Sequence, residues 1–220
     1  AFPPELEITQ GLFGVWLLPA ALFTLTVGMI GVLGAKRLDR LVAFSVIGSM
    51  GMLMTSVSVF TPAGIAAALF YAIHSTLATA TLFLLVDVVR SRRAAGDLTW
   101  MPAPPIAGGA LVAAMFFAAA IAMAGLPPLS GFVGKLLILD AALADPRMAW
   151  VWAVILCSSL IAVVGFSRAG SVLFWKAHAP LDDAGDIPAP QSQGPLPLVA
   201  IGALLSAIVL VTVFAGPINR

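Results

Sequence analysis

The residue in this sequence best suited to proton chemistry is a lysine inside an apolar run. Lys135 lies in the stretch GFVGKLL, residues 131–137. A lysine in the middle of a bilayer costs roughly 3 kcal/mol on insertion scales, so such a residue usually faces a protein interior or water. Because removal from water favours the neutral amine, Lys135 is a candidate proton carrier that alternates between charged and neutral forms. The alternative is a lysine that extends toward an interface and pairs with Asp140.

A second candidate is a histidine on another apolar segment. Tyr71, Ser75 and Thr79 recur every four residues, and His74 flanks the helical face that they share. Histidine titrates near neutral pH, so this polar stripe is typical of one step in a proton or water wire. Such side chains also hold membrane helices together by hydrogen bonds, and the sequence alone leaves both interpretations open.

The segment that carries Lys135 also contains residues that break a helix. They lie in the stretch AGLPPLSG and are Gly125, Pro127, Pro128, Ser130 and Gly131. Two adjacent prolines between glycines remove backbone donors and interrupt a helix. Unwound backbone is tolerated in a membrane only where it lines protein or a cavity, which favours the proton-carrier interpretation of Lys135.

Most other polar side chains indicate structural roles. The small residues of 45–58 most often allow close helix packing, which we favour over a path-lining role. Asp87 is three residues before Arg90 and is expected to pair with it, and Asp39 lies among basic residues that favour the same local pairing. Because one cysteine and two histidines cannot build a structural zinc site, the sequence predicts no metal, and it shows no motif for a cofactor.

The composition places these residues in a membrane. Hydrophobic residues make up 61% of the 220 residues, charged residues only 10%, and the mean hydropathy is +1.08. An ordinary soluble domain carries roughly a quarter charged residues, so lipid must be the solvent for most of this surface. The net charge of +1 gives no indication of a nucleic-acid partner.

Apolar runs long enough to cross a bilayer predict an all-α fold with about six membrane helices in one transmembrane domain over 1–220. The predicted spans are about 11–35, 41–60, 63–89, 106–144 (broken at 125–131), 150–166 and 197–214. An unbroken helix over 106–144 would be about 58 Å long, far more than the bilayer core. Since its second part alone is too short to span, we expect one crossing by a discontinuous helix.

The basic residues predict the orientation, because cytoplasmic loops are enriched in lysine and arginine. Six spans place loops 36–40, 90–105 and 167–196 on one side. These loops hold eight of the eleven basic residues: Lys36, Arg37, Arg40, Arg90, Arg92, Arg93, Arg168 and Lys176. We therefore expect these loops in the cytoplasm and both termini outside. The first residue is not methionine, which indicates a fragment or a processed start.

Several of these motifs resemble one superfamily. AGLPPLSGFVGK (124–135), LFYAIHSTL (69–77) and RLVAFS (40–45) are similar to motifs of the antiporter-like membrane subunits. That superfamily includes proton-pumping subunits of NADH–quinone oxidoreductase and large subunits of Mrp-type cation/proton antiporters. The LFYAIHSTL motif and SRAGSVLFW (167–175) most resemble the D-type Mrp subunit, also called Pha or Mnh.

The resemblance implies a fold of two inverted five-helix repeats, each with one broken helix, of which this chain matches the second repeat plus one further helix. It implies that Lys135 is the outlet-side proton site and that the His74 helix relays protons. Complex I-like proteins carry two histidines and a lysine where this chain has Tyr71, Ser75 and Thr79. Asp39 stands where a lysine is often found. Both departures weaken a Complex I assignment.

The expected function is therefore proton translocation in a Na⁺ or K⁺/H⁺ antiporter complex of the bacterial inner membrane, with other membrane subunits as partners. Such a chain would be a secondary-transporter subunit and not an enzyme. Two alternatives stay open. One is a proton-pumping subunit of a quinone-linked NADH dehydrogenase or membrane hydrogenase, and the other is a scaffold subunit whose polar residues only hold helices together.

Overall fold

The computed structural model describes residues 7–93, 98–100, 108–176 and 194–218. Its main helices are α1 (Glu7–Gly34), α2 (Leu38–Val57), α3 (Pro62–Arg92), α4 (Gly109–Ala124), α5 (Ser130–Ala141), α6 (Met148–Ser171) and α7 (Leu196–Val213). A π-helical stretch, Val172–Lys176, extends α6, and a short α8, Ala215–Ile218, follows α7. The described residues contain no strand, only one isolated bridge between Arg37 and Thr99. The predicted all-α class is confirmed.

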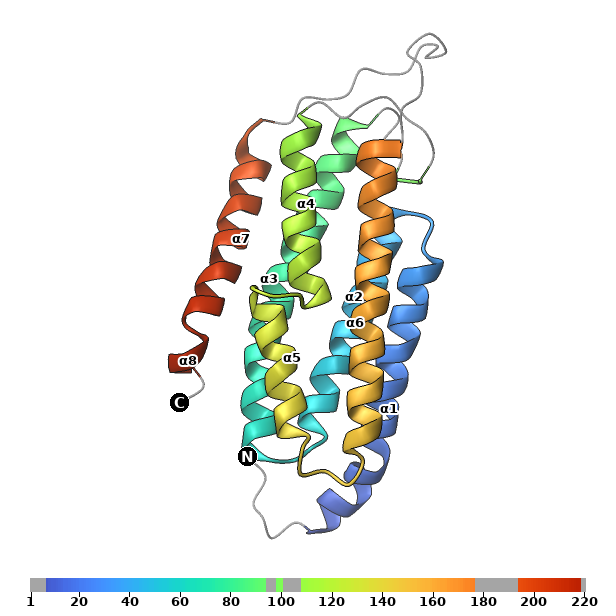
Figure 1. Cartoon of the computed structure of the whole chain (residues 1–220), viewed down its shortest axis with the longest axis vertical. Coiled ribbons are helices and arrows are strands. Elements are labelled where there is room, and N and C mark those ends of the chain that lie inside the picture. Colours follow the sequence, from blue (N-terminus) through green and yellow to red (C-terminus); the bar gives the residue numbers. More distant parts are fainter. Residues whose placement is uncertain (1–6, 94–97, 101–107, 177–193, 219–220) are drawn as a thin grey trace.

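Five of these helices are long and apolar enough to cross a membrane. The sixth crossing is divided between α4 and α5, which follow one another along the long axis of the bundle (Figure 1). The chain is thus a multi-pass membrane protein with one discontinuous helix, as the sequence predicts.

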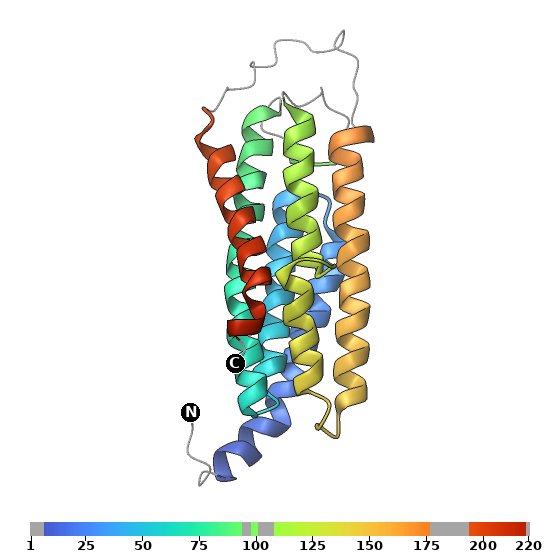
Figure 2. The same ribbon diagram turned by 60° about the vertical axis from the view of Figure 1, so that its left-hand side comes forward.

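Local sequence explains where the discontinuous helix stops and restarts. α4 ends at Ala124, and the next residue, Gly125, has a φ of 72°, a left-handed conformation that glycine adopts without steric cost. Pro127 and Pro128 follow and have no N–H to continue the helical ladder. α5 then begins at Ser130. The break lies at mid-height in the bundle, where α4 and α5 meet (Figure 2).

Small residues hold α1 close to α2. A side chain added at Gly28 would meet the backbone of Gly48, and one added at Gly51 would meet the backbone of Leu25. The two helix backbones therefore approach closely, as glycine allows in membranes. This contact agrees with the packing role expected for the small residues of α2.

The last long helix is peripheral. α7 lies along α3 and α4, at one side of the bundle (Figures 1 and 2). Only 11% of the residues of α7 are buried, namely Ile201 and Ile208. Most of α7 therefore faces lipid or a partner.

The described residues of the three basic loops meet at one end of the bundle. The Arg168 guanidinium donates to the carbonyls of Leu33 (2.8 Å) and Ala35 (3.0 Å) and lies 4.2 Å from the ring centre of Trp100. The backbone of Leu38 donates to Leu98. Segments from all three loops thus share this end, which we call the basic end. Its cytoplasmic placement stays a prediction, and both chain termini lie outside the described residues.

Candidate functional site

Lys135 is buried beside the helix break. Its side chain projects from the second turn of α5, and the residue is 7% exposed. The amine Nζ donates to the carbonyl oxygen of Ala124 at 2.6 Å and to the Ser159 hydroxyl of α6 at 2.8 Å. Ala124 is the last residue of α4, so the break leaves its carbonyl without a helical partner and available to the amine. Lys135 therefore completes the hydrogen bonding of the broken helix.

The surroundings of Lys135 carry no carboxylate at ion-pair distance within the described part of the chain. Asp140 is exposed, and the two acceptors of Lys135 are instead Ala124 and Ser159. Pairing of Lys135 with Asp140 at an interface is therefore not what the structure has. The negative end of the α4 dipole lies against the amine and can partly balance a positive charge there.

The absence of a side chain at Gly125 makes room for the side chain of Lys135. A Cβ on Gly125 would lie 2.7 Å from Cδ and Cε of Lys135 and 2.8 Å from its Nζ. The aliphatic chain of Lys135 therefore lies directly on the glycine, and no other residue type fits between them. The same glycine ends α4 and seats the amine.

His74, on α3, contacts the other side of the break. Its Nδ1 lies 2.8 Å from the Ser130 hydroxyl, at the start of α5, and both residues are fully buried. A Cβ on Gly131 would lie 2.8 Å from Nε2 and would collide with the carbonyl oxygen of Ala122. Nε2 itself has no hydrogen-bond partner of standard geometry. The imidazole is thus wedged between the end of α4 and the beginning of α5.

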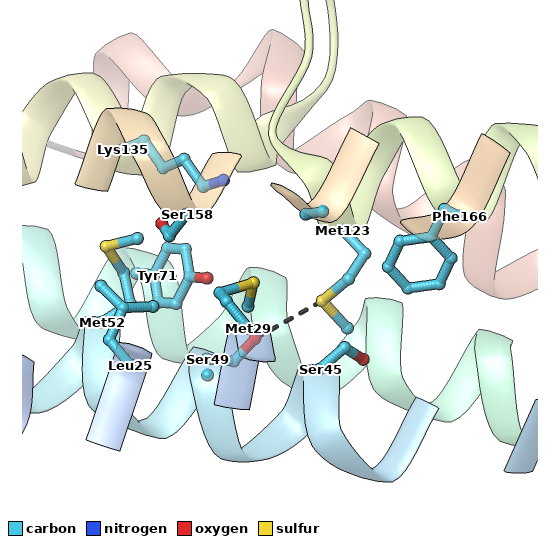
Figure 3. Close-up of a pocket in the computed structure, with 12 residues that line it drawn as sticks. Leu25, Met29, Ser45, Ser49, Met52, Tyr71, Met123, Lys135, Ser158 and Phe166 are labelled. Carbon is cyan, nitrogen blue, oxygen red and sulfur yellow. Dashed lines mark hydrogen bonds between the residues drawn. The ribbon is translucent and has the colours of Figure 1, made fainter. Parts of the chain in front are cut away.

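A small cavity lies next to Lys135, and Figure 3 shows the side chains around it. Its volume of about 10 Å³ is enough for about one water molecule. Its polar lining consists of Ser45, Ser49, Tyr71, Lys135 and Ser158. Three methionines, a phenylalanine and other apolar groups complete the wall. A polar cavity of this size beside a buried amine is suited to holding one water.

The serines of this cavity present acceptor oxygens to it. Ser45 and Ser158 donate their own protons to carbonyls of their helices, each at 2.7 Å, which leaves lone pairs on both hydroxyl oxygens. Ser49 donates to the Met123 sulfur at 3.4 Å, shown as a dashed line in Figure 3. From the sequence we expected the serines of α2 only to pack between helices. The structure shows that Ser45 and Ser49 also line this cavity.

Only part of the polar stripe of α3 lies near the cavity beside Lys135. The rings of Tyr71 and His74 are 5.7 Å apart, and Tyr71 lines the cavity, so these two residues connect the histidine to the lysine region. Ser75 is buried with an unpartnered hydroxyl, but it does not line the cavity. Thr79 is half-buried and lies outside it as well. Regular spacing predicts a shared face but not how far the site extends along it.

The three carboxylates considered in the sequence do not join the site. Asp39 forms a two-pronged ion pair with Arg37, at 2.9 and 3.0 Å, in agreement with the local pairing expected for it. Asp87 is exposed near the end of α3 at which the basic residues gather. Asp140 is exposed on α5.

The sequence reasoning missed two serines of α6 and two backbone carbonyls of α4 that take part in the site. Ser158 and Ser159 form the only adjacent pair of hydroxyl residues in the apolar core of α6, and this pair was the available signal. The carbonyls of Ala122 and Ala124 carry no sequence signal, because a backbone acceptor becomes available wherever a helix ends.

A family model described as NADH:quinone oxidoreductase/Mrp antiporter, TM, matches residues 4–162. The chain is 33% identical over 165 residues to the D subunit of the Na(+)/H(+) antiporter of Bacillus subtilis, covering 73% of this chain and 32% of that protein. It is 31% identical to the D subunit of a probable K(+)/H(+) antiporter of Rhizobium meliloti, over 93% of this chain and 42% of that one. The N 2 subunit of NADH-quinone oxidoreductase from Sorangium cellulosum is 32% identical, at coverages of 90% and 38%.

Two solved structures have the same fold. A chain of respiratory complex I from Thermus thermophilus superposes with a TM-score of 0.80 at 24% identity, covering 96% of this chain and 43% of that one. A chain of the Mrp complex from Dietzia sp. gives a TM-score of 0.78 at 21% identity, with coverages of 94% and 46%. The present chain spans about a third to two fifths of the length of the three relatives from Bacillus, Rhizobium and Sorangium.

Proposed function

The chain belongs to the NADH:quinone oxidoreductase/Mrp antiporter transmembrane family, and we propose that it is the proton-translocating part of a D-type subunit in a bacterial Na⁺ or K⁺/H⁺ antiporter. Relatives named as the D subunits of such antiporters support this assignment. The other membrane subunits of the complex would be its partners, in the inner membrane. In this role the chain is a transporter subunit and catalyses no covalent chemistry.

The observation that carries the proposal is the position of the Lys135 amine at the break. A neutral amine has two N–H groups, and Ala124 and Ser159 supply two acceptors for them. The remaining nitrogen lone pair is then free to accept a proton. After protonation, the third N–H can bond to a water in the adjacent cavity, while the α4 dipole offsets part of the charge. The site therefore accommodates both forms of the amine.

His74 would exchange the proton with Lys135. A positive charge on Lys135 would disfavour a second one on the imidazole of His74, so the proton would reside on one of the two side chains at a time. Tyr71 contacts the imidazole and lines the Lys135 cavity, which makes its hydroxyl the natural bridge. Of the stripe expected from the sequence, this route uses His74 and Tyr71.

The direct test is Lys135→Ala in the full-length subunit within its complex. We expect cation-dependent proton exchange in inverted membrane vesicles to fall to the background of vesicles without the complex, because the amine is the proton carrier. The matched control is Lys36→Ala, since Lys36 is exposed at the basic end. Unchanged exchange in Lys135→Ala, with the complex still assembled, would remove this lysine from the mechanism.

A second candidate function is proton pumping in a quinone-linked dehydrogenase. It is favoured by the identity of 32% to an N-type subunit of NADH-quinone oxidoreductase over 90% of this chain. Purification of the complex separates the two candidates. Flavin and iron–sulfur subunits that co-purify would support the dehydrogenase, whereas a complex of membrane subunits without redox groups would support the antiporter.

A further inference from the structure

The contact between Ser130 and His74 links the helix break to the histidine. Ser130 is the first residue of α5, fully buried, and its hydroxyl lies 2.8 Å from Nδ1 of His74. In the described structure this is the one hydrogen bond that the hydroxyl forms. A serine hydroxyl has one proton to donate, so the direction of this bond decides which ring nitrogen of the neutral histidine carries hydrogen.

The available donors and acceptors favour one direction for the hydrogen bond between Ser130 and His74. If Nδ1 carried the hydrogen and donated to Ser130, the serine proton would be left buried without an acceptor. The Nε2 lone pair would also lie near the carbonyl oxygen of Ala122, which can only accept. If Ser130 donates to Nδ1 instead, its proton is satisfied, and an Nε2–H lies near that carbonyl although without a hydrogen bond of standard geometry. In this second arrangement, the lone pair of Nε2 no longer lies against the lone pairs of the Ala122 carbonyl oxygen.

We propose that Ser130 is a positioning residue that holds neutral His74 in its Nε2–H form and so makes Nδ1 the nitrogen that accepts the transported proton. The inference rests on the proposed function for its role in transport, but the protonation pattern of the ring can be measured without transport. It assigns to Ser130 a role beyond breaking the helix.

Protonation of His74 at Nδ1 changes the hydrogen bond with Ser130. When a proton passes from the Lys135 ammonium through the Tyr71 hydroxyl to Nδ1, one N–H bond of the ammonium breaks and one N–H bond forms at Nδ1, which leaves a neutral amine and an imidazolium with hydrogens on both nitrogens. The Ser130 hydroxyl then rotates, so that its oxygen accepts from Nδ1–H. Gly131 makes this geometry accessible, because any side chain there would displace the ring or the Ala122 carbonyl.

Few other charges act on this ring. Lys135 of α5 and Tyr71 of α3 are the titratable groups nearby. Asp140 lies at the far end of α5, and α4 and α7 contain no titratable residue. On α2, Asp39 and Arg40 lie in the first turn at the basic end. The form of the ring is therefore set mainly by its contact with Ser130.

The first experiment measures the ring directly. Full-length protein with ¹⁵N-labelled histidine is reconstituted in lipid bilayers, and the His74 signals are assigned by their loss in His74→Gln. We expect the neutral wild-type ring to carry hydrogen on Nε2 alone and Ser130→Ala to give a mixture of both neutral forms. Ser58→Ala is the matched control, since its buried hydroxyl bonds only to Thr55 of its own helix. A wild-type ring with hydrogen on Nδ1, or a spectrum unchanged by Ser130→Ala, would overturn the proposal.

The second experiment asks whether Ser130 acts through His74. Ser130→Ala is expected to slow exchange about fivefold in the wild-type background, as loss of one buried hydrogen bond would. In the His74→Gln background the same change should have no further effect. An equal loss in both backgrounds would show that Ser130 has only a structural role. If wild-type vesicles show no exchange at all, the proposed function fails while the spectra still decide the role of Ser130.

Discussion

In the part of the chain that the structure describes, two helix ends are completed by a cation from another helix, and they differ in one respect. At the basic end, Arg168 of α6 donates to the carbonyls of Leu33 and Ala35, where α1 ends. At mid-membrane, Lys135 of α5 donates to the carbonyl of Ala124, where α4 ends. Both cations satisfy orphan carbonyls and meet the negative end of a helix dipole. The cation is an exposed arginine in one case and a buried lysine in the other.

The difference separates a structural cap from a site that can carry a proton. A guanidinium keeps its proton at any physiological pH and can only hold the loops together. An ammonium can lose its proton when the low dielectric around it disfavours charge. The same hydrogen-bonding geometry therefore supports anchoring at the surface and proton exchange in the interior.

The largest effect is expected from exchanging the two cations. Lys135→Arg keeps the positive charge and the capping bonds but removes the exchangeable proton, so we expect exchange in inverted vesicles to fall to background. Arg168→Lys should leave exchange within about twofold of wild type, since the basic end needs only a donor. If Lys135→Arg retained cation-dependent proton exchange, Lys135 would be only a helix cap, as Arg168 is, and not a proton carrier.

A smaller effect is expected at the glycine that seats the lysine. Gly125→Ala should destabilise the protein by roughly 1–2 kcal/mol, because alanine is strained at a positive φ and its Cβ would press on Lys135. The midpoint of thermal unfolding in detergent measures the loss, and exchange should fall with it. Gly202→Ala on α7 is the control: no atom lies within 4 Å of an added Cβ, so this variant should be as stable as wild type or more so. Equal stability of the two variants would contradict the close fit at Gly125.

The smallest effect concerns a third cation, at the opposite end of the bundle. Arg147 pairs with Asp145 at 3.0 Å, and this hydrogen-bonded partner holds the pKa of Asp145 below its usual value. The pair therefore stabilises the fold above the pKa of an unfolded aspartate, about 3.9, and the contribution is lost as pH falls through the lower folded pKa. Asp145→Asn should cost roughly 0.5 kcal/mol at pH 7.

The check is chemical unfolding of wild type and Asp145→Asn at several pH values. The difference between them should shrink toward zero as pH drops below 4. A constant difference across that range would mean that the Asp145 charge contributes nothing and that only the packing of the side chain matters.

Much of the fold follows from the sequence because lipid restricts the choices. Long apolar runs must be helices, and the prolines at 127 and 128 must interrupt one of them. A lysine beside that interruption is expected in the interior, and Lys135 is buried there. These conclusions need only local chemistry, so one sequence is sufficient for them.

The partners of the site did not follow in the same way. Periodicity tells which face of α3 carries His74, but not that α5 brings Ser130 to it. Ser159 reaches Lys135 only because α6 packs beside the break, which depends on the whole bundle. Thr79 has the right spacing but lies outside the cavity. Contacts between helices depend on rotation and depth, and neither is encoded in the spacing of one helix.

The long helix α6 makes contacts at two distant points of the bundle. The helix holds the buried amine through Ser159 and the end of α1 through Arg168, two attachment points about 13 Å apart along a single stiff rod. One continuous helix therefore contacts both the buried amine and the junction of Arg168 with Trp100. The buried amine and the surface junction thus depend on the placement of the same helix.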